Sequence, residues 1–211
     1  MEAETSAPTA RFPDAARALA PRAAELADVT ELSRRLPAEL VEAISAAGLF
    51  RMLVPAEAGG GEAEPAELVA AVSELARGDG SAGWCLAVAA TSGMLAAYLP
   101  LEAAREVFGE ETSVAGGVFA PMGRARVEAG GYSVSGRWRF GSGCEHCDWL
   151  MGGCLIEEGG GLRKLETGAP DIRFMLFPAA EAEVIDTWNV SGLKGTGSHD
   201  FSVSDVRVPE Q

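Results

Sequence analysis

Residues 131–149 read GYSVSGRWRFGSGCEHCDW, and the class of fold follows from this stretch and its flanks. Apolar and aromatic residues alternate with polar ones at Tyr132, Val134, Trp138 and Phe140. A period of two is typical of a β-strand with one buried face. The alternation predicts that these four side chains share one face of a strand, and that the serine two residues beyond Phe140 shares it too.

The sequence around this strand, from residue 112 onward, predicts further strands. Short apolar runs are separated by glycines and acidic turns. The expected strands are 113–119, 124–128, 132–140, 149–156, 172–177, 183–188 and 201–208. Gly130 and Gly131 are expected to join two of them as a hairpin, and 157–171 to form a solvated loop. Because no helical pattern intervenes, we predict an antiparallel β-barrel or sandwich.

Residues before 112 show helical patterning instead. One expected helix has an apolar face that repeats every three or four residues, at Leu36, Leu40, Val41, Ile44 and Ala47. A second helix begins at Pro65, and Pro100 begins a short amphipathic one. The chain is therefore expected to have an α+β fold, divided into a tail and first helix at 1–30, a helical domain at 31–111 and a β domain at 112–211.

The segment from Gly80 to Leu101 contains no charged residue and is long enough to span a bilayer. Most of its residues are alanine, glycine, serine and threonine. A helix buried on all sides within a protein core has the same composition, and we favour that interpretation.

Composition narrows the classes of partner. The 211-residue chain carries 17 Lys and Arg against 31 Asp and Glu, for a net charge of −14, and 47% of its residues are hydrophobic. This hydrophobic content excludes a disordered chain. A strongly negative surface repels phosphate backbones and anionic lipids, so we expect neither nucleic acid nor membrane as a partner. The N-terminal MEAETSAPTARFPD has neither the basic start nor the apolar run of an export signal, so we expect a cytoplasmic protein.

The four cysteines lie in apolar or glycine-rich contexts, at positions 85, 144, 147 and 154. They are interpreted as reduced thiols, because the chain lacks the dense cysteine framework of small secreted domains. Cys144 and Cys147, with His146 between them, resemble half of a zinc site. No second pair of ligands follows at a suitable spacing, so we expect no metal.

Two short glycine patterns, Gly141-Ser-Gly143 and Gly195-Thr-Gly197, resemble nucleotide-binding fingerprints. Neither pattern has the third glycine of the G-x-G-x-x-G fingerprint, and neither lies between a strand and an amphipathic helix. A Rossmann site is therefore not expected. An aromatic ring followed by a hydroxyl and glycine amides suits a planar heteroaromatic ligand. A glycine-rich turn that closes a corner of a barrel has the same composition, and the residues alone leave both interpretations open.

Four segments, in order along the chain, resemble the acyl-CoA dehydrogenase superfamily: GLFRMLVPAEAGGG (48–61), ELARGDGSAGW (74–84), GGYSVSGRWRFGSG (130–143) and VSGLKGTGSHDFSVSDVRVPE (190–210). The resemblance extends from about residue 31 to the C-terminus. In motif style it is closest to the two-component flavin-dependent monooxygenases and N-oxygenases of that superfamily. It implies a helical N-terminal domain, a β middle domain, and an FAD or FMN cofactor held against the latter.

The resemblance also implies residues that contact the flavin. A Trp-x-Thr of the dehydrogenases lies beside the flavin ring and bonds near N5, and its positions fall on Phe140 and Ser142. Ser142 would therefore hydrogen-bond near N5 and Phe140 would pack on the ring. The amides of Gly141 and Gly143 would face the edge of the ring.

Further contacts are implied upstream. A flavin-contacting segment of the family falls on 118–121, which includes Phe119 and Pro121. Trp84 would reach the flavin pocket from the helical domain, although a core tryptophan is an equally good interpretation. His199 could act as an acid or base, but a polar turn residue before a strand is the preferred interpretation.

Family members continue into a C-terminal helical bundle that supplies the dehydrogenase's catalytic glutamate and the tetramer interface. The bundle is absent from residues 1–211, so no catalytic base is assigned. The resemblance implies a flavin-dependent oxidoreductase, monooxygenase-like, with a small-molecule substrate and a separate flavin reductase. The alternatives are an acyl-CoA dehydrogenase that oxidises the CH–CH bond of an acyl thioester, and a truncated, non-catalytic binding or assembly piece. Activity and a homotetramer are expected of a full-length parent rather than of these residues alone.

Overall fold

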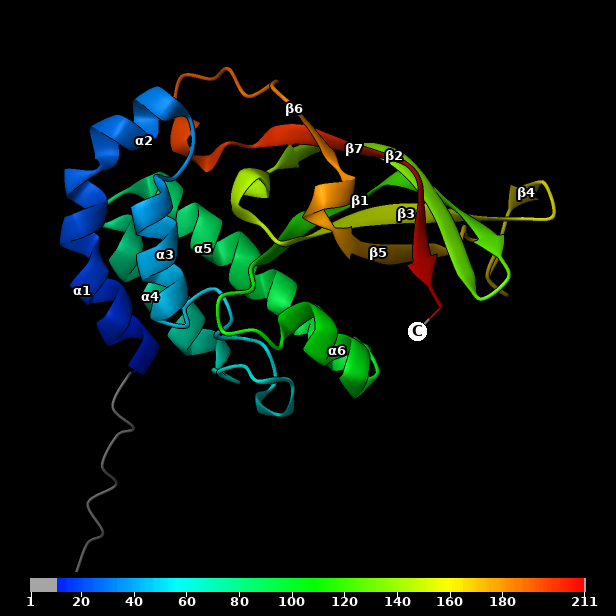
Figure 1. Cartoon of the computed structure of the whole chain (residues 1–211), viewed down its shortest axis with the longest axis horizontal. Coiled ribbons are helices and arrows are strands. Elements are labelled where there is room, and N and C mark those ends of the chain that lie inside the picture. The colour runs from blue at the N-terminus through cyan, green and yellow to red at the C-terminus, as the bar shows by residue number, and fades with distance from the viewer. Residues whose placement is uncertain (1–10, 211) are drawn as a thin grey trace, which may run out of the picture.

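The computed structural model describes residues 11–210, in which helices come first and strands follow (Figure 1). The α-helices are α1 (Arg11–Glu25), α2 (Ala27–Ser33), α3 (Ala38–Ala46), α4 (Pro65–Ala76), α5 (Gly80–Ser92) and α6 (Leu101–Phe108). The predicted helix starts at Pro65 and after Pro100 are confirmed. The expected N-terminal tail lies in part outside the described residues.

The first helix belongs to the helical core. Phe12, Ala16 and Ala23 of α1 are buried in the same hydrophobic cluster as Leu75 of α4. The described helical part therefore begins at Arg11 rather than near residue 31.

Helix α5 and the 3₁₀-helix η2 (Gly93–Tyr98) form the predicted charge-free segment. Asp79 caps α5, because its carboxylate accepts a hydrogen bond from the Ala82 amide at 2.8 Å. By length and composition alone Gly80–Tyr98 could cross a membrane, but Leu86 and Ala90 are fully buried in the helical core. One side of the segment therefore packs into the helical core and the segment lies next to the sheet (Figure 1), but the expectation that it is buried on all sides is wrong, because Trp84, Met94 and Tyr98 are exposed.

The strands are β1 (Ala115–Glu128), β2 (Gly131–Gly141), β3 (Trp149–Glu158), β4 (Gly161–Leu162), β5 (Ile172–Pro178), β6 (Glu183–Ile185) and β7 (His199–Pro209). They form one sheet in the order β4-β3-β1-β2-β7-β6, and β5 pairs with β3. β1 and β3 are parallel, and the other pairs are antiparallel.

The expectation of a purely antiparallel barrel or sandwich is therefore wrong, because the sheet is mixed. After the predicted β1–β2 hairpin, which is confirmed, the chain passes through the 3₁₀-helix η3 (Cys144–His146) and enters on the other edge of β1. Alternation of apolar residues shows where a strand lies but not which neighbour it pairs with, so the sequence could not reveal this crossing.

Several strand boundaries also differ from the expected ones. The two strands predicted at 113–119 and 124–128 are one strand, β1, whose register shifts on both sides of Pro121. Proline cannot donate to a sheet ladder, and the bulge accommodates it without ending the strand. The strand expected at 183–188 ends at Ile185, and the expected loop at 157–171 contains the short β4.

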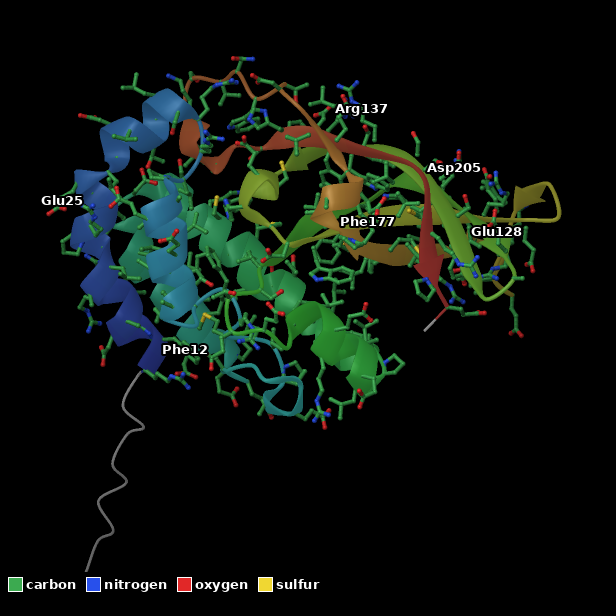
Figure 2. All side chains as sticks on the ribbon, viewed as in Figure 1. Phe12, Glu25, Glu128, Arg137, Phe177 and Asp205 are labelled. Atoms are coloured by element: carbon green, nitrogen blue, oxygen red, sulfur yellow. The ribbon has the colours of Figure 1, made fainter. Side chains whose placement is uncertain are left out.

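Within residues 11–210 the buried apolar side chains form three clusters, and Phe12 and Phe177 in Figure 2 mark the two largest, one in the helices and one in the sheet. The centre of the sheet core is Trp138, which is 0% exposed and whose Nε1 donates to the Gly153 carbonyl at 2.8 Å. Its ring packs against Phe201 and Phe177, with centroid distances of 5.3 and 5.8 Å.

Three glycines enclose the Trp138 ring, each from a different strand. A Cβ atom at Gly123, Gly136 or Gly152 would lie 2.2, 2.8 or 2.3 Å from an atom of the indole. Real Cβ atoms essentially never approach so closely, so the indole occupies the space that side chains would otherwise fill. Part of the chain's high glycine content is explained by this packing.

Candidate functional site

The end of β2 carries the residues that the sequence singled out, and its alternation breaks there. Phe140 has a φ of +66°, and the β2–β7 register shifts between Trp138 and Gly141. As a result Trp138 is inside the core while Phe140 is 62% exposed and Ser142 is 7% exposed. The expectation that these three side chains share one face is wrong, because the bulge turns Phe140 outward.

Ser142 joins the helical part to the sheet through its hydroxyl. Trp84 of α5 donates its indole N–H to Ser142 Oγ at 3.0 Å. Ser142 Oγ lies 2.7 Å from Ser198 Oγ, which lies 2.7 Å from Thr196 Oγ1. Thr196 Oγ1 donates to the Leu193 carbonyl at 2.8 Å. We call Ser142, Ser198 and Thr196 the hydroxyl chain.

Trp84 is 51% exposed, so it is not a core tryptophan. Asp79 caps the helix one turn earlier and fixes the start of α5. Trp84 therefore lies at the interface between the helices and the sheet, where its indole N–H donates to Ser142.

The glycines on either side of Ser142 have structural roles. The Gly143 amide donates to the Thr196 carbonyl at 2.8 Å, so this N–H is bonded within the protein rather than free to face a ligand. Gly143 has a φ of +74°, and a Cβ there would lie 2.8 Å from the His146 ring. Gly141 pairs with His199 in the β2–β7 ladder.

Phe119 and Pro121 lie on β1. Phe119 is 49% exposed and meets Phe174 of β5 edge to face, with a centroid distance of 5.1 Å. Pro121 pairs with Gly153 at the β1 bulge. Phe119 and Phe174 also line a mainly apolar cavity of about 510 Å³ between η2 and the sheet, together with Thr91, Met94, Leu95, Tyr98, Leu99, Arg173 and Leu176.

Phe140 has a partner that the sequence reasoning missed. Trp188 meets its ring edge to face, with a centroid distance of 6.2 Å. Trp188 belongs to the loop 186–193, which we name the 186–193 loop. In the sequence, the one feature that could have drawn attention to this loop is its position just before the glycine pattern at 195–197.

Arg34 of the helical part holds the 186–193 loop. Its guanidinium donates to both Asp186 carboxylate oxygens, at 2.7 and 2.5 Å, and to the Trp188 carbonyl at 3.0 Å. It also donates to the Asn189 side chain at 3.2 Å. The ion pair raises the pKa of Arg34 and lowers that of Asp186. Arg34 therefore positions the loop that carries Trp188.

The comparisons with known proteins bear on this arrangement. The family model described as acyl-CoA dehydrogenase, N-terminal domain, matches residues 9–106. The oxygenase subunit HsaA of a flavin-dependent monooxygenase from Rhodococcus jostii (strain RHA1) is 37% identical over 194 residues, covering 91% of this chain and 49% of that relative. The crystal structure of the HsaA monooxygenase from M. tuberculosis superposes with a TM-score of 0.85 at 36% identity, covering 94% of this chain and 53% of that one.

The chain belongs to the acyl-CoA dehydrogenase superfamily. Two further matches point the same way. Indole-3-acetate monooxygenase from Pseudomonas putida is 37% identical over 180 residues, covering 84% of this chain and 44% of the relative. XiaF from Streptomyces sp., solved in complex with FADH2 and glycerol, has a TM-score of 0.84 at 30% identity and covers 95% of this chain and 50% of that one. This superfamily member spans about half the length of these relatives.

The side chains present in this superfamily member fit a flavin ring. Trp84 exposes a large aromatic surface next to the Ser142 hydroxyl, and Phe140 and Phe119 are exposed aromatic rings on β2 and β1. Exposed aromatic rings lose unfavourable contact with water when a planar ligand covers them. Ser142 supplies the polar contact that a ring nitrogen requires.

His199 is not the turn residue that was expected, because it is buried and is the first residue of β7. Its Nδ1 accepts hydrogen bonds from the Thr187 and Trp188 amides, each at 3.2 Å. An Nδ1 that accepts carries no proton, so the proton of the neutral ring is on Nε2, 3.7 Å from a Glu145 carboxylate oxygen. His199 therefore helps to hold the 186–193 loop.

The four cysteines are free thiols in the structure. Burial raises the pKa of Cys144 and of Cys154 to about 12, and raises those of Cys85 and Cys147 as well. Within residues 11–210, no group of three His, Cys, Asp or Glu side chains is arranged to hold a metal ion.

Proposed function

We propose that this chain forms the helical and middle domains of the oxygenase component of a two-component flavin-dependent monooxygenase. The observation that carries the proposal is the contact of Trp84 with Ser142 beside the exposed Phe140 ring, in a chain 37% identical to an HsaA oxygenase subunit. Relatives named as FADH(2)-dependent or solved with FADH2 support a reduced flavin as the cofactor, either FAD or FMN.

Bound reduced flavin would supply the electrons that activate O₂ for hydroxylation of an organic substrate. In this proposal Ser142 Oγ hydrogen-bonds near N5, and the rings of Phe140 and Trp84 cover the flavin. The 186–193 loop holds Trp188 against Phe140 and shields the site from water. Exclusion of water protects reactive species from unproductive breakdown.

The apolar cavity of about 510 Å³ is proposed to hold the substrate. It opens beside Phe119, and its aromatic rings suit an aromatic compound. Relatives named for indole-3-acetate and resorcinol support that class.

Further parts of the proposal concern assembly and location. A separate flavin reductase would deliver the reduced flavin, because the relatives are an oxygenase subunit and an oxygenase component of their enzymes. A homotetramer would cover exposed apolar side chains such as Tyr98 and Leu193. The free thiols are in keeping with a cytoplasmic protein.

The test measures oxygen consumption by the purified full-length protein with an NADH-driven flavin reductase, and with resorcinol or indole-3-acetate as the probe substrate. We expect hydroxylated product that depends on flavin, and loss of product in Ser142→Ala. Ser204→Ala is the matched control, because Ser204 is exposed on β7. Reduction of bound flavin by an acyl-CoA without oxygen, with no hydroxylation, would instead indicate a dehydrogenase and overturn the proposal.

A further inference from the structure

The hydroxyl chain has a fixed direction, because its two ends permit only one arrangement in which every contact is a hydrogen bond. At one end the Trp84 indole N–H can only donate, and it donates to Ser142 Oγ. At the other end the Leu193 carbonyl can only accept, and Thr196 Oγ1 donates to it. Each hydroxyl between them has a single proton to give.

The protons can therefore be assigned in order. Thr196 gives its proton to the Leu193 carbonyl, so at the 2.7 Å contact Ser198 must donate to Thr196. Ser198 has then used its proton, so at the other 2.7 Å contact Ser142 must donate to Ser198. Ser142 Oγ is left with one free lone pair and no free proton.

Burial and backbone conformation hold this arrangement in place. Ser142, Ser198 and Thr196 are all buried, so water does not compete for their hydroxyls. Leu193 and Gly197 adopt left-handed conformations with φ of +53° and +50°. A left-handed leucine is strained, and here it aims the carbonyl that ends the chain at Thr196.

We infer that Ser198 and Thr196 are positioning residues that make Ser142 an acceptor, so that the site favours the reduced flavin. This inference rests on the proposed function, in which Ser142 faces the flavin N5. Reduced flavin carries a proton on N5 and can donate to the free lone pair of Ser142. Oxidised flavin has a lone pair on N5 instead, and this lone pair is repelled by the free lone pair of Ser142 Oγ.

The test uses the full-length protein and compares its dissociation constants for oxidised and dithionite-reduced FMN and FAD under anaerobic conditions, followed by tryptophan fluorescence. In the wild type we expect the reduced form to bind more tightly. Ser198→Ala removes the acceptor of the Ser142 proton, which then becomes available to oxidised N5. The ratio of the two constants should fall by about fivefold to tenfold, the effect of one neutral hydrogen bond.

Thr196→Val provides a second variant, because it removes the end of the chain and lets Ser198 donate to Ser142 instead. It should lower the ratio in the same direction, whereas Ser204→Ala should leave the ratio unchanged. An unchanged ratio in a folded Ser198→Ala or Thr196→Val protein that still binds both forms overturns the inference and leaves the proposed function intact. A wild-type protein that binds neither form overturns both.

Discussion

Replacing Gly152 with alanine should destabilise the protein severely, through the packing of Trp138. The new Cβ would lie 2.3 and 2.4 Å from two atoms of the indole, where ordinary contact begins at 3.4 Å. One of the two groups must therefore shift by about 1 Å. The indole has little freedom to move, since Gly123 of β1 and Gly136 of β2 also lie so close to it that a Cβ on either would clash with the ring.

The magnitude has two parts. Overpacking a dense core costs about 1–3 kcal/mol. If the ring moves far enough to lose its hydrogen bond to the Gly153 carbonyl, that buried acceptor is unsatisfied, at a further cost of about 1–3 kcal/mol. We therefore expect the free energy of unfolding to fall by roughly 2–6 kcal/mol when both effects operate.

The assay is urea unfolding followed by circular dichroism. Gly192→Ala is the matched control, because a Cβ at Gly192 meets no atom within 4 Å and its φ is not left-handed. The control should stay within about 0.5 kcal/mol of the wild type. A Gly152→Ala protein whose midpoint matches that of the control would refute the packing argument.

Three further predictions concern titration, thiols and the 186–193 loop. Burial lowers the pKa of His146 to about 4, so between about pH 6.5 and pH 4 the unfolded chain is protonated at His146 while the folded chain is not. The free energy of unfolding should therefore fall as the pH drops through this range, and His146→Gln should flatten that part of a pH profile measured by urea unfolding. Because burial raises the pKa values of the cysteines, dithionitrobenzoate should label the native protein slowly at pH 8 and all 4 thiols rapidly in guanidinium; rapid native labelling would contradict their burial. Arg34→Lys loses the two-pronged contact with Asp186 and should speed hydrogen exchange in the 186–193 loop, whereas Arg35→Lys, whose partner is Glu145, should leave that loop's exchange as in the wild type.

The sequence predicted the features that depend on neighbours along the chain. Pro65 begins a helix because its missing N–H would have no partner in the first turn. Gly48 follows a helix with a φ of +71°, as expected of a glycine at that position. Local rules of this kind can be read without knowing the fold.

The missed features depend on residues far apart in the sequence. Ser198 contacts Ser142 across 56 positions, and Arg34 contacts Asp186 across 152. The outward turn of Phe140 follows from a bulge in the β2–β7 ladder, which a one-strand pattern cannot show. The resemblance therefore located Ser142 and Trp84, while the direction of the hydroxyl chain required the three-dimensional arrangement.

The long-range contacts between helices and sheet also determine when, during translation, this interface can form. Cys85 of α5 contacts the Thr196 carbonyl, 111 positions later in the chain. At about 5–20 residues per second, a ribosome needs roughly 6 to 22 seconds to make that intervening stretch. During this interval the helices have been translated, but the surface that will receive the glycine-rich turn at 195–197 has no partner. That surface of α5 therefore stays uncovered on the nascent chain until the residues around Thr196 emerge.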